Sequence, residues 1–293
     1  MYTLAVDIGG TKIATGIINA DNEWIVTDKH PSITTSESAM FDALVASIDG
    51  IIEKANMDKK DITAIGITVP GQVDVEQGIS IYANNLPWRH FPLKEKLQGI
   101  YEDQVIVFEH DVIAAAYGEW AVRDFPAELF LYKTVSTGIC ASIINHGEVV
   151  RGTGTAGEVG LIPMDGTKSL EDVASGPAME RGVQAIDASL DLEAGFAAWE
   201  NGNEALDAFF NDRAFDLARG IYTLLSVFDS HRIVLGGGVL NNQKKFFDLV
   251  MEKFTSLCIH PFQENWAERI EHSQLEGTSG LYGAAMKAKM QAQ

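Results

Sequence analysis

Apolar residues near the start of the chain fall into two runs that are separated by a polar, glycine-containing bend. The pattern predicts strands at Tyr2–Ile8, Lys12–Ala20 and Glu23–Asp28, with a turn at Asp21-Asn22. The first two runs are almost continuously apolar, which is typical of strands that are covered on both faces. A hairpin needs turn residues, but it does not need the carboxylate, hydroxyl and ammonium groups that gather around this bend.

The next segment alternates a helix with further strands. A helix is predicted from Glu37 to Ala55, because its apolar positions recur at the i, i+3, i+4 spacing of a core-facing stripe. Strands are predicted at Ile62–Val69 and Val105–Phe108, and another helix begins near Asp111. Strands and helices in this order indicate an α/β layered fold.

The second half of the chain repeats the start of the first. Lys133–Val150 again has the pattern of strand, Thr-Gly break, strand, turn and short strand, and a short strand at Arg232–Leu235 runs into three glycines. The repeat indicates a duplication, with ligand held in a cleft between two lobes. We expect a small lobe at 1–115, a larger lobe at 116–278, and a last helix, 279–293, that packs back onto the first lobe. Helices are predicted at Ala178–Ala188, Glu204–Asn211, Arg213–Asp229, Asn242–Leu257 and Ser279–Met290.

Composition narrows the choice of partners. The chain has 293 residues, and 41 acidic against 22 basic side chains give a formal net charge of -19. This charge repels nucleic-acid phosphates and anionic membrane surfaces, so neither is an expected partner. Cys140 and Cys258 are far apart in the sequence and are interpreted as free thiols of a reducing compartment. Asp7 interrupts the first apolar run before it reaches the length of a signal sequence, so we expect a soluble, cytoplasmic protein.

Three bends that interrupt strands carry candidate chemistry: "DIGGTK" at Asp7–Lys12, "STG" at Ser136–Gly138 and "GGG" at Gly236–Gly238. Glycines allow backbone N–H groups to approach a ligand, and hydroxyl and ammonium groups add donors. A carboxylate such as Asp7 lies beside a phosphate only when a divalent cation separates them, so the set indicates a Mg²⁺–nucleotide site. The alternative interpretation is that each bend is a tight turn and nothing more.

Two other phosphate-binding motifs do not apply. The chain contains no G-x-x-x-x-G-K-[ST] motif, which argues against a P-loop protein. The letters of "GTGTAG" at Gly152–Gly157 match a dinucleotide motif, but "EVGLIPM" follows and does not begin a helix. Because a dinucleotide-binding fold needs that helix N-terminus, an oxidoreductase is only a third interpretation.

The segments "DIGGTK", "EHDVIAAAYGE", "STG", "GTAGEVG", "LEDVASG" and "LGGGV" occur in this order. Their order and spacing resemble the ROK family of sugar kinases and sugar-responsive repressors over nearly the whole chain. The resemblance implies a two-lobed actin-like (ribonuclease H-like) ATPase fold with duplicated domains. Repressor members carry a DNA-binding segment ahead of the first strand, and here that strand begins at residue 2, which favours the kinase interpretation.

The resemblance also implies roles for individual residues. Asp111 matches the general base that takes the proton of the sugar 6-hydroxyl, and Asp7 matches the acid that positions hydrated Mg²⁺. The simpler alternatives are a helix N-cap for Asp111 and solvated surface carboxylates for Glu158 and Glu171. The residues expected to bind the nucleotide are Asp7, Gly9, Gly10, Thr11, Lys12, Thr137, Gly138, Gly236 and Gly237. The residues expected to bind the sugar are Gly71, Asn85, His110, Asp111, Glu158 and Glu171.

The chain departs from the family pattern where many members bind structural zinc. Those members carry C-x-C-G-x-x-G-C and a histidine in G-E-x-G-H, whereas Leu161–Asp172 has no cysteine and Leu161 replaces the histidine. Without thiolate or imidazole ligands we expect no zinc. The lost histidine contacts sugar in relatives. We therefore hypothesise that Leu161 leaves a more apolar, roomier corner that weakens discrimination or admits an N-acetyl or β-glycosidic substituent.

Two further departures concern the base and the phosphate bend. His110 stands where the family usually has asparagine. It can still donate to a sugar hydroxyl, and its charge can shift the neighbouring base, or it can pack away from the ligand. Cys140-Ala141 follow the "STG" bend where relatives continue with glycines, so their side chains are expected to crowd the nucleotide.

We therefore expect an ATP- and Mg²⁺-dependent hexose kinase that transfers the γ-phosphoryl group to the 6-hydroxyl of a hexose. Glucose-type hexoses, N-acetylmannosamine and β-glucosides stay open as substrates, and the resemblance implies a homodimer. The alternative is a sugar-binding sensor without turnover. Asp7, Lys12 and Asp111 argue against it, because a pure binder does not need all three.

Overall fold

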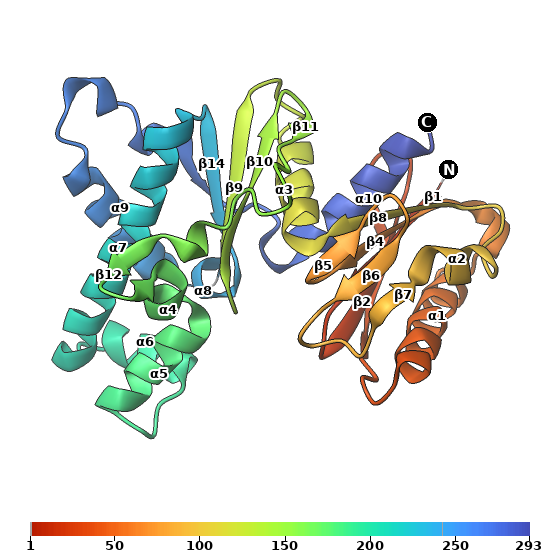
Figure 1. The fold of residues 1–293 in the computed structure, drawn as a ribbon, viewed down its shortest axis with the longest axis horizontal. Helices are drawn as coiled ribbons and strands as arrows, with labels where there is room; N and C mark the ends of the chain where they lie inside the picture. The colour runs from red at the N-terminus through yellow and green to blue at the C-terminus, as the bar shows by residue number, and fades with distance from the viewer. Residues whose placement is uncertain (1, 242) are drawn as a thin grey trace. The chain divides into compact units, whose positions relative to one another are not determined.

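The computed structural model describes residues 2–241 and 243–293, and the chain divides into two compact units (Figure 1). Unit 1 comprises the chain up to Asp124 together with residues 278–293, and unit 2 comprises residues 125–277. The division follows Asp124 and not residue 115, because helix α3 (Asp111–Ala121) continues through the expected boundary. The last helix, α10 (Ser279–Gln291), belongs to unit 1.

Unit 1 is built on a five-stranded sheet with the strand order β3-β2-β1-β4-β8. β1 and β3 each pair with β2 in antiparallel fashion, whereas β1, β4 and β8 are parallel. The carboxyl ends of the three parallel strands therefore lie at one edge of the sheet. The strands span Tyr2–Ile8 (β1), Lys12–Ile18 (β2), Trp24–Pro31 (β3), Ile62–Val69 (β4) and Val105–His110 (β8).

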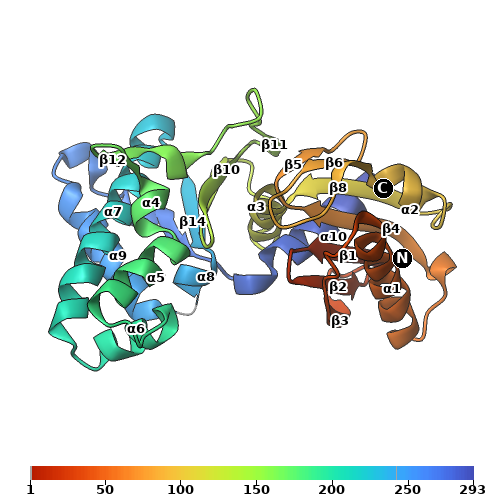
Figure 2. The same ribbon diagram turned by 60° about the horizontal axis from the view of Figure 1, so that its bottom comes forward.

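Helices α1 and α10 cover opposite faces of this sheet (Figures 1 and 2). α1 spans Glu37–Lys54, and the hydroxyl of Ser36 caps its start by accepting a hydrogen bond from the Ala39 amide. Ile65 on β4 packs in the core cluster with α1, whereas its neighbour Gly66 lies against α10. Because successive strand residues point to opposite faces, this alternation of large and small residues lets α10 approach the sheet closely.

The connection between β4 and β8 contains a small sheet that the sequence patterns did not predict. It consists of β5 (Gln72–Asp74), β6 (Ile79–Tyr82) and β7 (Arg89–Pro92), followed by the short helix α2 (Leu93–Gln98). Trp88, just before β7, is fully buried in the core of unit 1. These strands are too short to show a clear alternation of polar and apolar residues, so hydrophobic periodicity does not reveal them.

Unit 2 repeats the sheet of unit 1 strand for strand, with the order β11-β10-β9-β14-β15. β10 is antiparallel to both β9 and β11, and β9, β14 and β15 are parallel. The predicted duplication is confirmed. The strands span Leu129–Val135 (β9), Ile139–Asn145 (β10), Glu148–Val149 (β11), Arg232–Gly236 (β14) and Ile270–His272 (β15).

The long connection from β11 to β14 is mostly helical, and one helix differs from its prediction. A single helix, α7 (Glu204–Phe228), replaces the two predicted helices at Glu204–Asn211 and Arg213–Asp229. Asp212, at the predicted break, lies on the exposed face of α7 and does not interrupt its backbone. The remaining elements of unit 2 are the hairpin β12 (Pro163–Asp165) and β13 (Lys168–Ser169), α4 (Leu170–Ala174), α5 (Gly176–Ile186), α6 (Leu192–Glu200), α8 (Gly238–Asn241) and α9 (Lys244–Leu257).

Other helix ends differ from the sequence pattern in smaller ways. α5 begins at Gly176 and not at Ala178, because Pro177 is favoured in the first turn of a helix. α4 and α6 are short and were not predicted. The predicted helix start at Asn242 lies outside the described residues, and α9 is described from Lys244. No helix within the described ranges is both long and apolar enough to cross a membrane.

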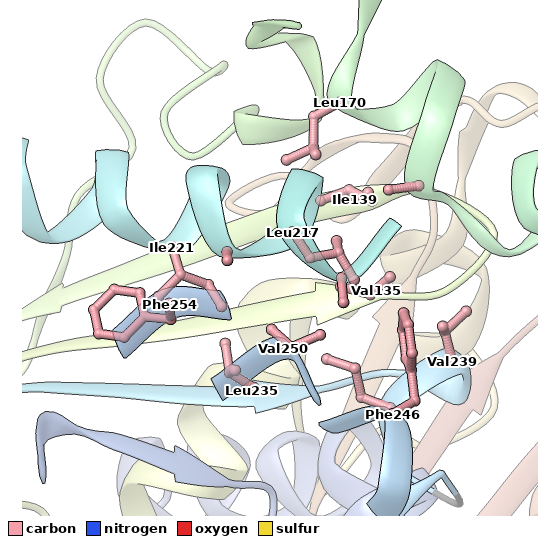
Figure 3. Close-up of a cluster of buried hydrophobic side chains, with 14 of the residues drawn as sticks. Val135, Ile139, Leu170, Leu217, Ile221, Leu235, Val239, Phe246, Val250 and Phe254 are labelled. Carbon is pink, nitrogen blue, oxygen red and sulfur yellow. The ribbon is translucent and has the colours of Figure 1, made fainter. Parts of the chain in front are cut away.

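The core of unit 2 combines side chains from its sheet and its helices (Figure 3). Val135 and Ile139 come from paired strands, Leu217 and Ile221 from α7, and Phe254 from α9, and all five are buried. The spacing of four residues between Leu217 and Ile221 places both on one face of the helix. This stripe, repeated along α7, holds the long helix against the sheet and against α9.

One charged residue is enclosed in this apolar core. The side chain of Lys133 on β9 is fully buried, and its Nζ donates a hydrogen bond to the Leu217 carbonyl at 3.5 Å. A Cβ added at Gly220 on α7 would lie 2.8 Å from the same Nζ, so the glycine leaves room for the ammonium group. Burial lowers the pKa of Lys133 to about 7, because the charged form loses its hydration.

We expect the substitution Lys133→Met to stabilise the protein. The folded state lowers the pKa of this lysine from 10.5 to about 7, so its burial costs most stability below the folded pKa. The cost disappears as the pH rises towards the unfolded pKa. Near neutral pH the variant should gain on the order of 3 kcal/mol in the free energy of unfolding. Urea unfolding at neutral and at strongly alkaline pH measures the gain and its disappearance.

An exposed lysine of the same unit provides the control. Lys168→Met, on β13, should change the free energy of unfolding by less than about 0.5 kcal/mol at either pH. Equal stability of Lys133→Met and the unmodified protein near neutral pH would show that the buried ammonium group carries no penalty.

Candidate active site

The bend between β1 and β2 is held by main-chain hydrogen bonds and by one serine. The Gly9 amide donates to the Lys12 carbonyl at 2.9 Å, and the Ser32 hydroxyl donates to the Gly9 carbonyl at 2.6 Å. The Ser32 amide donates to the Thr11 carbonyl at 3.0 Å. The side chains of Thr11 and Lys12 are exposed, so a hydroxyl and an ammonium group project from a well-supported backbone.

Asp7 precedes this bend on β1 and is half-buried. Its Oδ1 accepts a hydrogen bond from the Thr68 hydroxyl at 2.5 Å, because the two residues are paired in the parallel β1–β4 ladder. Burial raises the pKa of Asp7 and the negative charge of Asp111 adds to the rise, against the Thr68 hydrogen bond and the positive charge of Lys12. A cation beside this carboxylate would relieve both the lost hydration and the repulsion.

Asp111 is the first residue of α3 and follows β8 directly. Its side chain is 41% exposed, and its Oδ1 accepts a hydrogen bond from the Val112 amide at 2.8 Å. A Cβ added at Gly280 on α10 would lie 3.8 Å from the Asp111 carbonyl oxygen and 3.9 Å from the Asp7 carboxyl carbon. Asp111, the predicted general base, and Asp7, the carboxylate predicted beside phosphate, are therefore neighbours in unit 1.

The other residues of unit 1 predicted to bind sugar lie near these acids and the bend. His110 Nδ1 is 3.3 Å from Oδ1 of Asp111, so its imidazole contacts the predicted base. Asn85 packs on the bend, since a Cβ added at Gly10 would lie only 2.7 Å from the Asn85 Cβ. Gly71 has a φ of +78°, and a Cβ there would lie 2.3 Å from a main-chain oxygen at the end of β6. Neither glycine could carry a side chain without moving its neighbours.

α3, which begins with the predicted base, is held by α10 from the far end of the chain. A Cβ added at Gly283 would lie 1.7 Å from the Ala114 carbonyl oxygen, and one at Gly118 would lie 2.3 Å from the Ser279 carbonyl oxygen. The two helices therefore pack backbone against backbone, which only glycine permits. The buried carboxylate of Glu119 adds a polar contact by accepting a hydrogen bond from the Ser279 hydroxyl at 2.8 Å.

In unit 2 the bend between β9 and β10 is closed by its own backbone and by two helices. The Ser136 amide donates to the Gly138 carbonyl at 2.9 Å, and the Gly176 amide of α5 donates to the Ser136 carbonyl at 2.8 Å. On α4, Glu171 Oε2 accepts a hydrogen bond from the Ile139 amide at 2.8 Å. Glu171, the predicted sugar ligand, is therefore hydrogen-bonded to the residue that directly follows the predicted phosphate-binding bend.

The "GEVG" segment is tied to β10 and leaves its polar residue exposed. The Gly157 carbonyl accepts a hydrogen bond from the Ala141 amide at 2.8 Å. Glu158 is exposed, as is Thr137 at the tip of the neighbouring bend. Leu161 ends the short 3-10 helix that follows Glu158, and 66% of this leucine is exposed.

The three glycines after β14 pack against β9. A Cβ added at Gly236 would lie 2.5 Å from the Tyr132 hydroxyl oxygen. Gly237 has a φ of +95°, and a Cβ there would lie 2.3 Å from the Val135 carbonyl oxygen. A side chain at Gly236 would have to displace the Tyr132 ring, and one at Gly237 would meet the backbone of β9. The main chain of this bend is consequently not covered by side chains at these two positions, which is what the close approach of a nucleotide would need.

The structure also shows where the residues after the "STG" bend and the dinucleotide-like letters lie. The Ala141 side chain lies in the core of unit 2 and not in the bend, and Cys140 Sγ is 3.5 Å from the Gly157 carbonyl oxygen. The expected crowding therefore does not involve Ala141. The dinucleotide-like letters at Gly152–Gly157 form turns before a three-residue 3-10 helix, so the α-helix that a dinucleotide motif needs does not follow them.

The donor set of unit 1 suits Mg²⁺ better than a metal held by protein alone. Among the described residues, no group of three or more His, Cys, Asp or Glu side chains is arranged to hold a metal ion. Mg²⁺ commonly uses only one or two carboxylates together with phosphate oxygens and water. Asp7, whose raised pKa reflects burial and a second nearby carboxylate, fits that requirement.

Sequence reasoning missed the residues that support the predicted ones. Thr68 holds Asp7, Ser32 holds the bend, and Ser279 links α10 to α3. None of them belongs to a recognisable motif. The one available signal was Thr68, a hydroxyl residue between Ile67 and Val69 near the end of a mainly apolar strand, because a hydroxyl group that becomes buried needs a partner.

The two matching sheets, each with a glycine-containing bend after its first strand, define an α/β fold of the actin-like (ribonuclease H-like) ATPase type. The profile of the ROK family matches residues 3–291. The chain belongs to the ROK family.

Known proteins similar to this chain include sugar kinases. A glucokinase from Streptomyces coelicolor is 29% identical over 98% of this chain and 97% of the relative. An N-acetylmannosamine kinase from Escherichia coli is 30% identical over 82% of this chain and 84% of the relative. The crystal structure of a ROK family glucokinase from Streptomyces griseus in complex with glucose and AMPPNP has a TM-score of 0.81 at 27% identity, covering 99% of this chain and 100% of that chain.

The glycine contacts of α10 predict effects of different size for two similar substitutions. Gly283→Ala places a methyl group where the Ala114 carbonyl oxygen lies, so we expect a loss of about 2 kcal/mol in the free energy of unfolding. Gly280→Ala adds its methyl group at ordinary contact distances and gains helix propensity, so its effect should stay within about 1 kcal/mol. Urea unfolding of both variants checks this, and equal stability of the two would contradict the close approach of α3 and α10.

Proposed function

We propose that the protein is an ATP-dependent hexose kinase that transfers the γ-phosphoryl group to the 6-hydroxyl of a hexose. The observation that carries this proposal is the pair of carboxylates, Asp7 and Asp111, that lie near one another at the carboxyl edge of the unit 1 sheet with Lys12 beside them. One acid suits a cation on phosphate, and the other suits a hydroxyl proton. The glucokinase and N-acetylmannosamine kinase relatives support a sugar kinase.

Asp111 acts as the general base in this proposal. The sugar hydroxyl oxygen attacks the γ-phosphorus, the bond between that phosphorus and the bridging ADP oxygen breaks, and the hydroxyl proton moves to the Asp111 carboxylate. A carboxylate is a weak base, so most of its contribution comes from its placement next to the hydroxyl. The half-exposed side chain at the start of α3 leaves the carboxylate accessible to a substrate.

The bends are proposed to bind the nucleotide. In unit 1 the Gly10 amide, the Thr11 hydroxyl and the Lys12 ammonium group screen the charge of the transferred phosphoryl group. Gly9, whose amide donates to the Lys12 carbonyl, keeps the bend closed beneath them. Asp7 would hold hydrated Mg²⁺, which supplies further charge screening when it is bound. In unit 2 the exposed Thr137 and the adjoining Gly138 are proposed to bind the inner phosphates, and the bare backbone at Gly236-Gly237 the adenosine.

The chemistry of the side chains proposed to bind the sugar sets the substrate class. Asn85 and His110 of unit 1 and Glu158 and Glu171 of unit 2 offer the amide, imidazole and carboxylate groups that pair with hydroxyls. Leu161, which follows Glu158 closely and is largely exposed, can offer only apolar contact. We propose that this end of the sugar site tolerates a substituent, so glucose, N-acetylmannosamine and a β-glucoside are the substrates to compare.

A coupled assay of ADP release with these three sugars tests the proposal. ADP release that requires ATP, Mg²⁺ and one of the sugars is the expected result. Measurable sugar binding without ADP release for any of them would contradict it and favour a sensor. Turnover of glucose with rejection of both substituted sugars would remove the role given to Leu161.

We expect the substitution Asp111→Asn to abolish turnover and to spare sugar binding. An amide has the shape of the carboxylate but cannot accept the proton, so kcat should fall by at least about 100-fold. Sugar affinity, measured by calorimetry, should change by less than about threefold.

Asp103→Asn, in the exposed loop before β8, is the matched control and should leave kcat unchanged. If Asp111→Asn kept activity within about tenfold of the unmodified protein, the general base would be another group.

A further inference from the structure

The residue next to the proposed base has an imidazole group in contact with it. His110 is the last residue of β8, and its Nδ1 lies 3.3 Å from Oδ1 of Asp111. The His110 side chain is 29% exposed, so it is reachable by solvent and by substrate. This contact is absent from the sequence pattern, because adjacent residues at a strand–helix junction do not have to face one another.

Hydrogen bonds distinguish the two oxygens of the Asp111 carboxylate. Oδ1 accepts a hydrogen bond from the Val112 amide at 2.8 Å and also faces His110 Nδ1. Among the described residues, Oδ2 accepts no hydrogen bond from the protein. Because Oδ1 is hydrogen-bonded to the Val112 amide and faces the imidazole, Oδ2 is the oxygen left for a substrate hydroxyl.

A purely structural role for the imidazole does not account for this arrangement. His110 occupies the N-cap position of α3, but its side chain makes no capping hydrogen bond to the free amides of the first turn. Its main chain is supported separately, because the His110 amide donates to Glu109 Oε1 at 2.9 Å. The ring is therefore available for Asp111.

Of the charged groups described near His110, Asp111 is the one that contacts its ring. Asp111 on α3 contacts the ring, and Asp7 on β1 is a second negative charge near Asp111. Glu109, which precedes His110 on β8, is buried and paired with Lys287 of α10, so its charge is balanced. The residue paired with His110 on β4 is the apolar Val69. A change in the charge of His110 therefore acts most strongly on the carboxylate of Asp111.

We propose that His110 is a positioning residue for the general base. Its Nδ1–H and the Val112 amide together hold Oδ1 of Asp111 and direct Oδ2 to the substrate hydroxyl. The proposal rests on the proposed function, in which Oδ2 takes the hydroxyl proton as the oxygen–phosphorus bond forms and the bond to ADP breaks.

The imidazole also gives the reaction a dependence on pH that an amide at the same position would not give. A neutral imidazole donates one hydrogen bond and adds no net charge beside the carboxylate. A protonated imidazole adds a positive charge at 3.3 Å, which favours the ionised carboxylate and weakens it as a base. Transfer should therefore be slower with a protonated His110 than with a neutral one.

The experiment compares pH profiles of kcat/KM for the best sugar of the panel at saturating ATP and Mg²⁺. The unmodified protein should show an acid limb to which protonation of His110 contributes. His110→Asn keeps a neutral donor, so it should lose that limb and lower kcat/KM at alkaline pH only about threefold. His110→Ala removes the donor and should lower kcat/KM at alkaline pH about thirtyfold, mainly through kcat. His90→Asn, on the exposed strand β7, is the control and should keep the profile of the unmodified protein.

Two outcomes would overturn the proposal in distinguishable ways. A His110→Asn profile with the same acid limb as the unmodified protein would refute the role of His110 and leave the hexose kinase intact. Failure of the unmodified protein to phosphorylate any hexose would overturn the proposed function together with this inference.

A readout independent of activity is the ¹⁵N spectrum of the His110 ring. A neutral ring protonated on Nε2 instead of Nδ1 would also refute the proposal, and a ring protonated on Nδ1 would support it.

Discussion

The parallel pairing of β1, β4 and β8 is the constraint on which the chemistry of unit 1 depends. It places Asp7 opposite Thr68 and Val69 opposite His110, so three strand ends bring polar groups to one edge of the sheet. Main-chain hydrogen bonds hold this register, and a slip of one residue would turn Asp7 to the other face. The acids are therefore positioned by ladder hydrogen bonds before any contact among their side chains is made.

Unit 2 uses the same ladder for a different kind of group. β9 and β14 are parallel neighbours and end at the "STG" and "GGG" bends, where the corresponding strands of unit 1 end near carboxylates. Bare backbone amides suit phosphate and adenosine, whereas carboxylates suit a cation and a hydroxyl proton. The duplicated fold thus has carboxylates at the strand ends of unit 1 and bare glycine backbone after β14 in unit 2, in addition to the glycine-containing bend that follows the first strand of each unit.

Long elements with a strong apolar pattern could be predicted within a few residues, and short or polar ones could not. The strands around Asp7 and the helix from Glu37 have buried faces that dominate their composition. The break predicted near Asp212 was wrong, because an exposed acid in the middle of a long helix resembles a helix end in sequence. β5, β6 and β7 were missed, since three or four residues cannot establish a period.

The sequence by itself determined the order of the bends, the acids beside them, and the duplication that relates the two halves, because each of these is a local pattern of residue types. Only the tertiary structure decided which groups meet. Thr68 reaches Asp7, Glu171 holds the Ile139 amide, and α10 closes onto α3, in each case across many residues of chain. Even the contact of His110 with its neighbour Asp111 depends on the backbone conformation at the junction between β8 and α3. Such contacts follow from strand register and from close packing at glycines, and neither is encoded in any short stretch of sequence.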